Sequence, residues 1–185
     1  MKELSTLEKI SAFLFGALIT FGITWGLYKI LFPREKNIAA IQAPFNSENI
    51  NLIHTFEEIK TAAENGISDA QFILGLMYYE AQNYSEAAEW YRKAAEQGNA
   101  KAQFNLGNKY YEGKGVKQDY KEAFKWYKKA AEQGHAQAQF NLGCMYGRGE
   151  GVSKNYFEVN KWLTKSARQG NQDAQEFLKK LKISW

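Results

Sequence analysis

Few residues of this chain have side chains suited to catalysis. The sequence contains a single cysteine, Cys144, and two histidines, His54 and His135. A nucleophilic thiol needs a base beside it, and His135 lies nine residues before Cys144 with no pattern that brings the two together. We therefore expect Cys144 to be a half-buried helix residue and His135 to be a helix cap or a turn residue.

Side chains that bind metals and cofactors are also scarce. A structural zinc site uses four cysteine or histidine ligands, so one cysteine and two histidines are too few. A single cysteine also excludes an intramolecular disulfide framework. The carboxylates are spread along the chain, and the segment Gly113-Lys114-Gly115 does not follow a strand pattern as a phosphate loop would. The sequence thus predicts no enzyme, no metal site and no cofactor.

The charge of the chain does not indicate a nucleic-acid partner. The sequence carries 24 Lys and Arg against 20 Asp and Glu, a formal net charge of +4, which is small and mixed along the chain. Lys121, Lys125 and Lys128 form a stripe at helical spacing, with Lys129 adjacent. Such a stripe can touch acidic lipid or nucleic acid, but a solvated helix face is the usual explanation and the one we favour.

The N-terminal region contains a long uncharged segment. Residues 10–28 are nineteen consecutive residues without a charge, and a helix of that length approaches the roughly 30 Å thickness of the hydrocarbon core. Lys9 and Lys29 flank the segment, while Trp25 and Tyr28 lie where interfacial anchors are found. A cleaved signal peptide fits less well because the segment is long and no small-residue cleavage site follows at once. A buried core helix is the remaining alternative.

These features predict four regions in the chain. Residues 1–9 are a short tail, residues 10–32 a single transmembrane helix acting as a signal anchor, and residues 33–51 a linker. Residues 52–182 are the folded part. The cations on the two flanks of the membrane segment are similar in number and do not decide which side of the membrane the folded part occupies.

Internal repeats organise the folded part. The segments AQFILG at 70–75, AQFNLG at 102–107 and AQFNLG at 138–143 are near copies, and Trp90, Trp126 and Trp162 recur every thirty-six residues. We expect three complete units and two half units. The complete units lie at about 69–98, 101–134 and 137–170, and the half units at 55–66 and 172–182.

Each unit is expected to form two antiparallel helices. A polar residue followed three positions later by glutamate opens each second helix, which is the spacing of a capping box; the pairs are Asn83/Glu86, Asp119/Glu122 and Asn155/Glu158. Glycine is expected to end each second helix in a left-handed conformation, at Gly66, Gly98, Gly134 and Gly170.

A second set of glycines falls inside the first helices, at Gly75, Gly107 and Gly143. Glycine inside a helix costs about 1 kcal/mol relative to alanine, so its recurrence indicates close packing of the partner helix. We expect Trp126, Ala130 and Ala131 to provide the large and small surfaces that interlock there.

The repeated segment AQFNLGNKYYEGKGVKQDYKEAFKWYKKAAEQG closely resembles the Sel-one-like repeat (SLR), a relative of the tetratricopeptide repeat. The resemblance covers residues 70–170 well and 52–182 loosely. The turn Gly-x-Gly-Val is present at 113–116 and 149–152, whereas the first unit has the shorter Ala81-Gln82-Asn83. The resemblance implies an all-α, right-handed α-solenoid of antiparallel helix pairs. It also implies a non-catalytic protein that binds other proteins, frequently in signalling or envelope assembly in bacteria.

By similarity to tetratricopeptide proteins, the first helices should line the concave side and present a binding stripe. Asparagine amides can both donate to and accept from a peptide backbone, although Asn105 and Asn141 recur with the repeat and could instead bond the adjacent helix. Leu76, Asn108 and Cys144 occupy equivalent positions and differ between units, which favours a role in specificity. The predicted partner-binding residues are Leu76, Lys101, Phe104, Asn105, Asn108, Glu112, Asn141 and Arg148.

The sequence therefore predicts a membrane-anchored protein–protein interaction module, an adaptor or regulator that binds a protein or peptide on the concave face. The alternative is a structural or assembly protein of an envelope complex that acts through repeat stacking or oligomerisation, without a ligand in the groove. In both cases the chain would be a single-pass protein of a bacterial inner membrane, held there through residues 10–32, and no nucleic acid is expected as a partner.

Overall fold

The computed structural model describes residues 56–180, 182 and 183. The predicted tail, membrane helix and linker, at 1–9, 10–32 and 33–51, lie outside the described residues. Among the residues that are described, no helix combines the length and the hydropathy needed to cross a bilayer.

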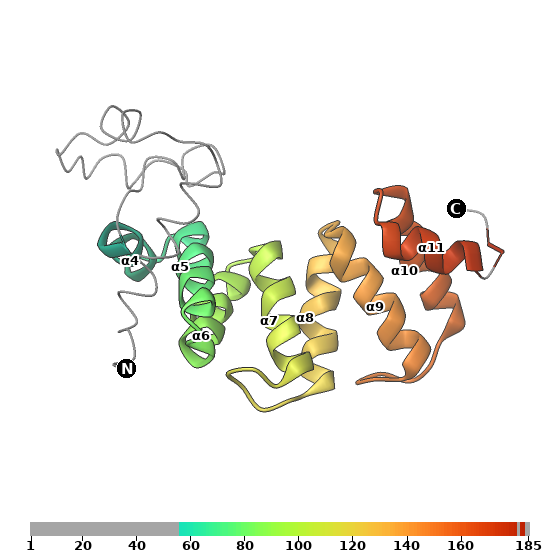
Figure 1. The fold of residues 1–185 in the computed structure, drawn as a ribbon, viewed down its shortest axis with the longest axis horizontal. Helices are drawn as coiled ribbons and strands as arrows, with labels where there is room; N and C mark the ends of the chain where they lie inside the picture. Colours follow the sequence, from blue (N-terminus) through green and yellow to red (C-terminus); the bar gives the residue numbers. More distant parts are fainter. Residues whose placement is uncertain (1–55, 181, 184–185) are drawn as a thin grey trace, which may run out of the picture. The chain divides into compact units, whose positions relative to one another are not determined.

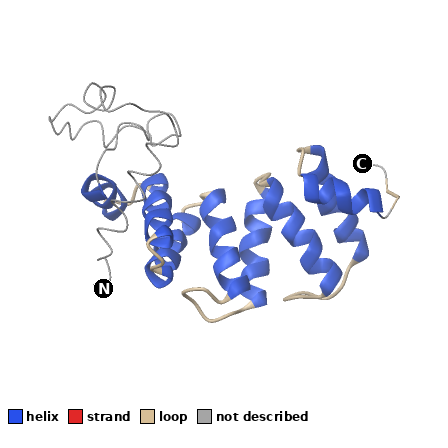
Figure 2. Cartoon of the chain, viewed as in Figure 1, coloured by secondary structure: helices blue, strands red, loops and turns tan. Residues whose placement is uncertain are grey.

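The described part of the chain is all-α, without strands, as the sequence predicts (Figures 1 and 2). It contains eight helices, of which α5 to α10 have 13 residues each. The helices are α4 (Phe56–Glu64), α5 (Ser68–Glu80), α6 (Tyr84–Glu96), α7 (Ala100–Glu112), α8 (Tyr120–Glu132), α9 (Ala136–Arg148), α10 (Tyr156–Arg168) and α11 (Gln172–Lys180).

The chain divides into two compact units, Met1–Lys93 and Ala94–Trp185, with the boundary inside α6. In the first, α4 packs on α5 around a cluster that includes Ile59 and Leu74. In the second, each helix from α7 to α11 packs on the next one in the sequence. The core therefore follows the chain from helix to helix.

Helices α7 and α8 show how the two helices of a repeat pair. Near the turn, the backbone N–H of Asp119 donates to the carbonyl of Tyr110 at 3.0 Å. Farther from the turn, the Tyr127 hydroxyl meets Asn108. Because a later residue in α8 meets an earlier residue in α7, the two helices are antiparallel, as expected.

The predicted ends of the second helices are confirmed. Gly98 and Gly134 have φ angles of 95° and 91°, in the left-handed region that glycine enters without strain. After Gly134, the backbone N–H of His135 donates to the carbonyl of Ala130 at 3.1 Å. This bond satisfies one of the carbonyls left open at the helix end, and the chain turns into α9.

The predicted capping boxes form only in part. The Asp119 carboxylate accepts from the backbone N–H groups of Lys121 and Glu122 at 2.8 and 3.1 Å, so Asp119 caps α8. The Glu122 carboxylate does not return to the backbone of Asp119, whose N–H is already bonded to Tyr110. It accepts instead from the indole of Trp126 at 3.1 Å. The glutamate therefore positions the tryptophan rather than completing the cap.

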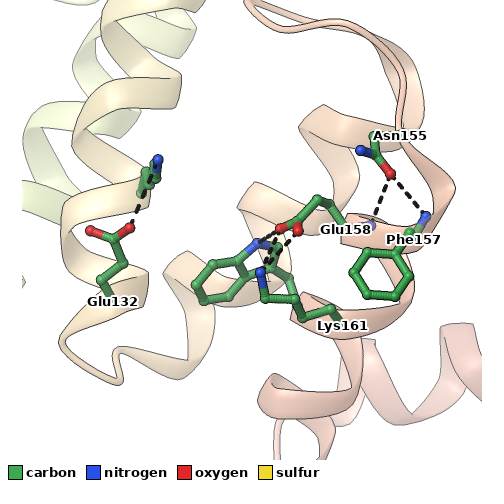
Figure 3. A network of polar contacts seen from close by, with 7 residues as sticks. Glu132, Asn155, Phe157, Glu158 and Lys161 are labelled. Carbon is green, nitrogen blue, oxygen red and sulfur yellow. Dashed lines mark hydrogen bonds and ion pairs between the residues drawn. The ribbon is translucent and has the colours of Figure 1, made fainter.

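Helix α10 repeats this arrangement (Figure 3). The Asn155 side chain accepts from the backbone of Phe157 and Glu158, and the Glu158 carboxylate bonds Lys161 at 2.9 Å and Trp162 at 2.7 Å. The hydrogen bond from Lys161 lowers the pKa of Glu158 below its ordinary range. The carboxylate thus stays ionised while it holds the two side chains.

The glycines inside the first helices make the predicted close contact, but with a different partner. A Cβ atom on Gly107 would lie 2.6 Å from Cδ1 of Tyr127, closer than real Cβ contacts allow. Gly143 faces Leu163 in the same way, at 3.0 Å. The expectation that Trp126, Ala130 and Ala131 fill this contact is wrong, because the side chain directly after each tryptophan points at the glycine.

Replacing Gly107 with alanine should lower the free energy of unfolding by about 1–3 kcal/mol, because the added methyl group overlaps the Tyr127 ring. Gly147→Ala is the matched control, since its Cβ would lie at an ordinary 3.5 Å from Val159. We expect that control to be neutral or stabilising by up to about 1 kcal/mol. Thermal unfolding followed by circular dichroism measures both. Equal melting temperatures would contradict the account of the close contact.

One buried lysine was not expected. The side chain of Lys109 in α7 is only 4% exposed, and the other two units carry methionine at this position, Met77 and Met145. Burial lowers the pKa of Lys109 below its ordinary value of 10.5 because the charged form loses its water. A comparison of the units in register could have identified this residue.

Lys109→Met should raise the free energy of unfolding at pH 7 by on the order of 1 kcal/mol, because a buried charge is removed. The pKa is lower in the folded state, so the unfolded chain binds more protons between that pKa and 10.5. The stability of the parent protein therefore rises with pH through this window. The advantage of the variant should shrink from pH 7 to pH 10 in urea titrations, and an advantage that grows would contradict this assignment.

Candidate functional site

Most predicted partner-binding residues lie on the first helices of the second and third repeats. Lys101, Phe104, Asn105, Asn108 and Glu112 belong to α7. Asn141 and Arg148 belong to α9, within the same compact unit. Leu76 lies in α5, which belongs to the unit Met1–Lys93, and is partly buried.

Two of the predicted asparagines are engaged inside the fold. The buried Tyr127 hydroxyl donates to Oδ1 of Asn108 at 2.6 Å. Burial raises the pKa of Tyr127 far above its ordinary value, and a hydrogen bond with Asn141 acts in the opposite direction. The hydroxyl from α8 thus holds the amide of Asn108 on α7 and lies close to the amide of Asn141 on α9. Tyr127 therefore orders this part of α7, and Asn108 is engaged before a ligand binds.

Asn105 differs from these two asparagines. It lies one turn before Asn108 on α7 and is partly exposed. Within the part of the chain that the structure describes, its amide has no hydrogen-bond partner, and the exposed ammonium group of Lys101 forms no ion pair. Asn105 and Lys101 are therefore free to bond a ligand, since both the amide and the ammonium group can reach solvent.

Phe104 contributes to the packing of the face. Its ring stacks on the His135 ring with the centroids 4.6 Å apart, and it also contacts Tyr127. His135 caps α9 as predicted, because its Nδ1 accepts from the backbone N–H of Ala138 at 3.2 Å. Burial lowers the pKa of His135 below 6.5, so the ring is neutral at pH 7 and able to accept this bond.

The C-terminal ends of the two helices carry a second group of contacts. Arg148 donates to the Tyr111 hydroxyl at 2.9 Å, and that hydroxyl donates to Glu150 at 3.0 Å. Glu112 forms an ion pair with Lys114 at 3.1 Å. Arg148 and Glu112 are therefore already satisfied by neighbours, although both remain exposed.

The role of the glutamine in each repeated segment was not expected from the sequence. Gln103 is only 4% exposed, and its Nε2 donates to the main-chain carbonyl of Ala95 at 3.0 Å. Its own oxygen accepts from Gln133 at 2.7 Å. Recurrence in register could have identified it. The same bond to the preceding second helix is made by Gln71 to Ala63, Gln139 to Ala131 and Gln175 to Ala167.

Neither an activated thiol nor a group of metal ligands is found among the described residues. Cys144 is a half-buried helix residue, as expected, and burial raises the pKa of its thiol. Across 56–180, 182 and 183, no group of three or more histidine, cysteine, aspartate or glutamate side chains could hold a metal ion. What the described surface offers is a set of amides, charges and rings suited to non-covalent recognition.

The repeats match a known protein family. The model of the Sel1 repeat matches residues 68–99, 100–135 and 136–171, which together make up more than half of the chain. The chain belongs to the Sel1 repeat family. No curated protein matches it.

Solved structures of Sel1 repeat proteins are similar in fold. A Sel1 repeat protein from Oxalobacter formigenes is 39% identical, with a TM-score of 0.63, over 67% of this chain and 96% of that one. A protective antigen of uropathogenic Escherichia coli, which displays an SLR fold, is 41% identical, with a TM-score of 0.62. That match covers 64% of this chain and 26% of the antigen, so this chain spans about a quarter of its length.

A third similar structure is cysteine rich protein B of Helicobacter pylori, at 27% identity and a TM-score of 0.55, over 67% of this chain and 98% of that one. The Sel1 repeat chain described here has only Cys144, so the cysteine content in that name has no counterpart. Together these similarities identify a repeat solenoid of the SLR type. Sel1 repeat proteins generally mediate protein–protein interactions and are typically non-catalytic scaffolds.

The thiol of Cys144 should be a poor nucleophile in the folded Sel1 repeat protein, because burial disfavours the thiolate. We expect dithiodipyridine at pH 7 to modify it at least about tenfold more slowly than free cysteine. The same chain in guanidinium chloride is the control and should react at the rate of free cysteine. Fast modification of the folded protein would contradict this prediction and indicate a reactive thiol.

Proposed function

We propose that this Sel1 repeat protein is an adaptor or regulator that binds a protein or peptide on the face formed by α7 and α9. The observation that carries the proposal is the free amide of Asn105 beside the exposed ammonium group of Lys101. An amide can donate to and accept from the backbone of an extended segment, and the lysine adds a charged contact.

The position of Lys101 supports a role in binding. It lies in the first turn of α7, where the positive end of the helix dipole favours an acidic side chain. A lysine there opposes helix stability by a few tenths of a kcal/mol, so the stability of α7 does not explain its presence. Attraction of an acidic group on a partner would explain it.

The surroundings of Asn105 support the proposal in a second way. The hydroxyl of Tyr127 holds Asn108 on α7 and lies close to Asn141 on α9, so the amide of Asn108 is ordered before any ligand arrives. A face that is already ordered loses little conformational entropy on binding. We assign Asn108 and Asn141 to positioning of the face and Asn105 and Lys101 to direct contact.

Membrane anchoring is the second part of the proposal. The nineteen uncharged residues at 10–28 have the length of a membrane-spanning helix, and the linker at 33–51 would separate it from the repeat domain at 52–182. The repeats would then form a right-handed superhelix held close to a bacterial inner membrane. A partner bound there would be recruited to the same surface.

One observation favours the alternative function, an assembly protein that acts through contacts between repeats. Tyr156 and Phe157 at the start of α10 are 73% and 75% exposed, which is unusual for large apolar side chains. Helix α11 weighs against stacking in the manner of a further repeat. Lys179 occupies the position of Gly143, so a second helix could not approach α11 as α10 approaches α9. We therefore favour recruitment of a protein partner over the alternative, assembly through contacts between repeats.

A photoreactive amino acid at position 105 tests the proposed face in membranes of expressing cells. Position 128 on α8 is the matched control, because Lys128 is exposed and lies outside the proposed face. A discrete protein adduct should form at position 105 and not at position 128. Lys101→Glu should reduce the yield of this adduct about tenfold or more, which corresponds to the loss of a contact worth about 1.4 kcal/mol, while Lys128→Glu leaves it unchanged.

Circular dichroism must show the same helicity and melting temperature for both lysine variants, so that a lost adduct reports a lost contact. Equal adducts at positions 105 and 128, or an adduct that does not respond to Lys101→Glu, would place the partner elsewhere.

A further inference from the structure

Helix α11 begins with the same contacts as α7 and α9. In all three helices, the residue before the helix accepts a bond from the backbone N–H of an alanine in the first turn, and a glutamine bonds the end of the preceding helix. The N-cap bonds are Ala102 to Asn99 at 2.9 Å, Ala138 to His135 at 3.2 Å and Ala174 to Asn171 at 2.9 Å. Residues thirty-six apart therefore occupy equivalent positions on the three helices.

The equivalence puts α11 on the proposed binding face. Ala174 and Leu178 are buried against α10, as the corresponding alanine and leucine of α9 are buried. Asp173 then corresponds to Lys101, and Phe177 corresponds to Asn105. Burial is the main cause of the raised pKa of the Cys144 thiol, and the charge of Asp173 adds to it, so the carboxylate lies within electrostatic range of α9.

The side chains on α11 differ in kind from those on α7. At the second position of the helix, the charge changes from positive at Lys101 through neutral at Gln137 to negative at Asp173. Glu176 adds a second exposed carboxylate on α11, while the exposed Lys180, nearer the end of the helix, occupies the position of Asn108. The start of α11 is therefore acidic, whereas the start of α7 is basic.

Phe177 adds an apolar side chain to α11. Its ring is 41% exposed, whereas the equivalent positions on α7 and α9 carry polar amides. The helix dipole is sufficient to explain an aspartate in the first turn of α11, but it does not explain an exposed phenylalanine. Burial under a ligand side chain would remove that apolar surface from water.

We infer that α11 extends the proposed face and that the face selects an extended peptide with an acidic residue at one end and, at the other, a basic residue next to an apolar one. This inference rests on the proposed function and adds the chemistry and the direction of the ligand. The acidic residue would pair with Lys101, the basic residue with Asp173 and Glu176, and the apolar side chain would cover Phe177. Complementary charges of this kind determine which partner binds and in which direction.

Selection from a random library of linear peptides tests the inference with the full-length protein in detergent micelles. The parent protein should enrich peptides with an acidic end and a basic–apolar end. The double variant Lys101→Asp, Asp173→Lys should enrich the opposite order of charges. Phe177→Asn, which restores the amide of the other helices, should remove the apolar preference and leave the charge order. Lys128→Asp is the control and should select the same peptides as the parent.

Affinities of single synthetic peptides, measured by fluorescence polarisation, complete the test. A selected peptide should bind the parent about tenfold or more tightly than the same peptide with its charges exchanged, and the double variant should invert that ratio. Enriched peptides that ignore the charge exchange would overturn this inference but not the proposed function. If folded parent protein enriches no peptide at all, both the inference and peptide binding by this face are wrong.

Discussion

The bond from a buried glutamine to the end of the preceding helix is the interaction on which the repeats depend. The last carbonyls of a helix have no partner within that helix, and a buried carbonyl without a hydrogen bond is costly. The carbonyls of Ala95 and Ala131 accept from the backbone N–H groups of Gly98 and Gly134 in the turn, at 3.1 and 3.0 Å. Gln103 and Gln139 add a second donor to each carbonyl, from the first helix of the next repeat. Each glutamine bond therefore ties the end of one repeat to the first helix of the next and helps to set how the two dock.

Within a repeat, the two helices are held together by the contact between a glycine and the tyrosine or leucine opposite it. Gly107 lets the ring of Tyr127 lie directly on α7, and from there the hydroxyl reaches Asn108. Close packing thus delivers a polar group to the surface between α7 and α9. The stability of the core and the order of the proposed binding face have the same origin, because one side chain serves both.

Much of this arrangement could be predicted from the sequence, because the repeats show which residues occupy equivalent positions in each unit. The helix pairs, the glycine ends, the caps at Asp119 and Asn155 and the need for close packing at Gly107 all follow from residues that recur in every unit. Self-comparison does not reveal which way a side chain points across a helix pair. For that reason Trp126 was expected at the glycine, where Tyr127 lies.

The same limit applies to the candidate site. Sequence reasoning could name the stripe on α7 but could not separate Asn108, already bonded to a hydroxyl, from Asn105, whose amide is open. That distinction depends on a partner from another helix, nineteen residues away in the case of Tyr127. The charges on α11 can be read from the sequence. The equivalence of Asp173 with Lys101, however, follows from the N-cap bonds that α7 and α11 share.

A row of nearly equal modules unfolds as a whole only if no module is much weaker than its neighbours. The second complete module differs from its neighbours, because it has the buried Lys109 at the position where the modules before and after it have methionine. We expect the array to open first from its middle rather than to fray from its ends.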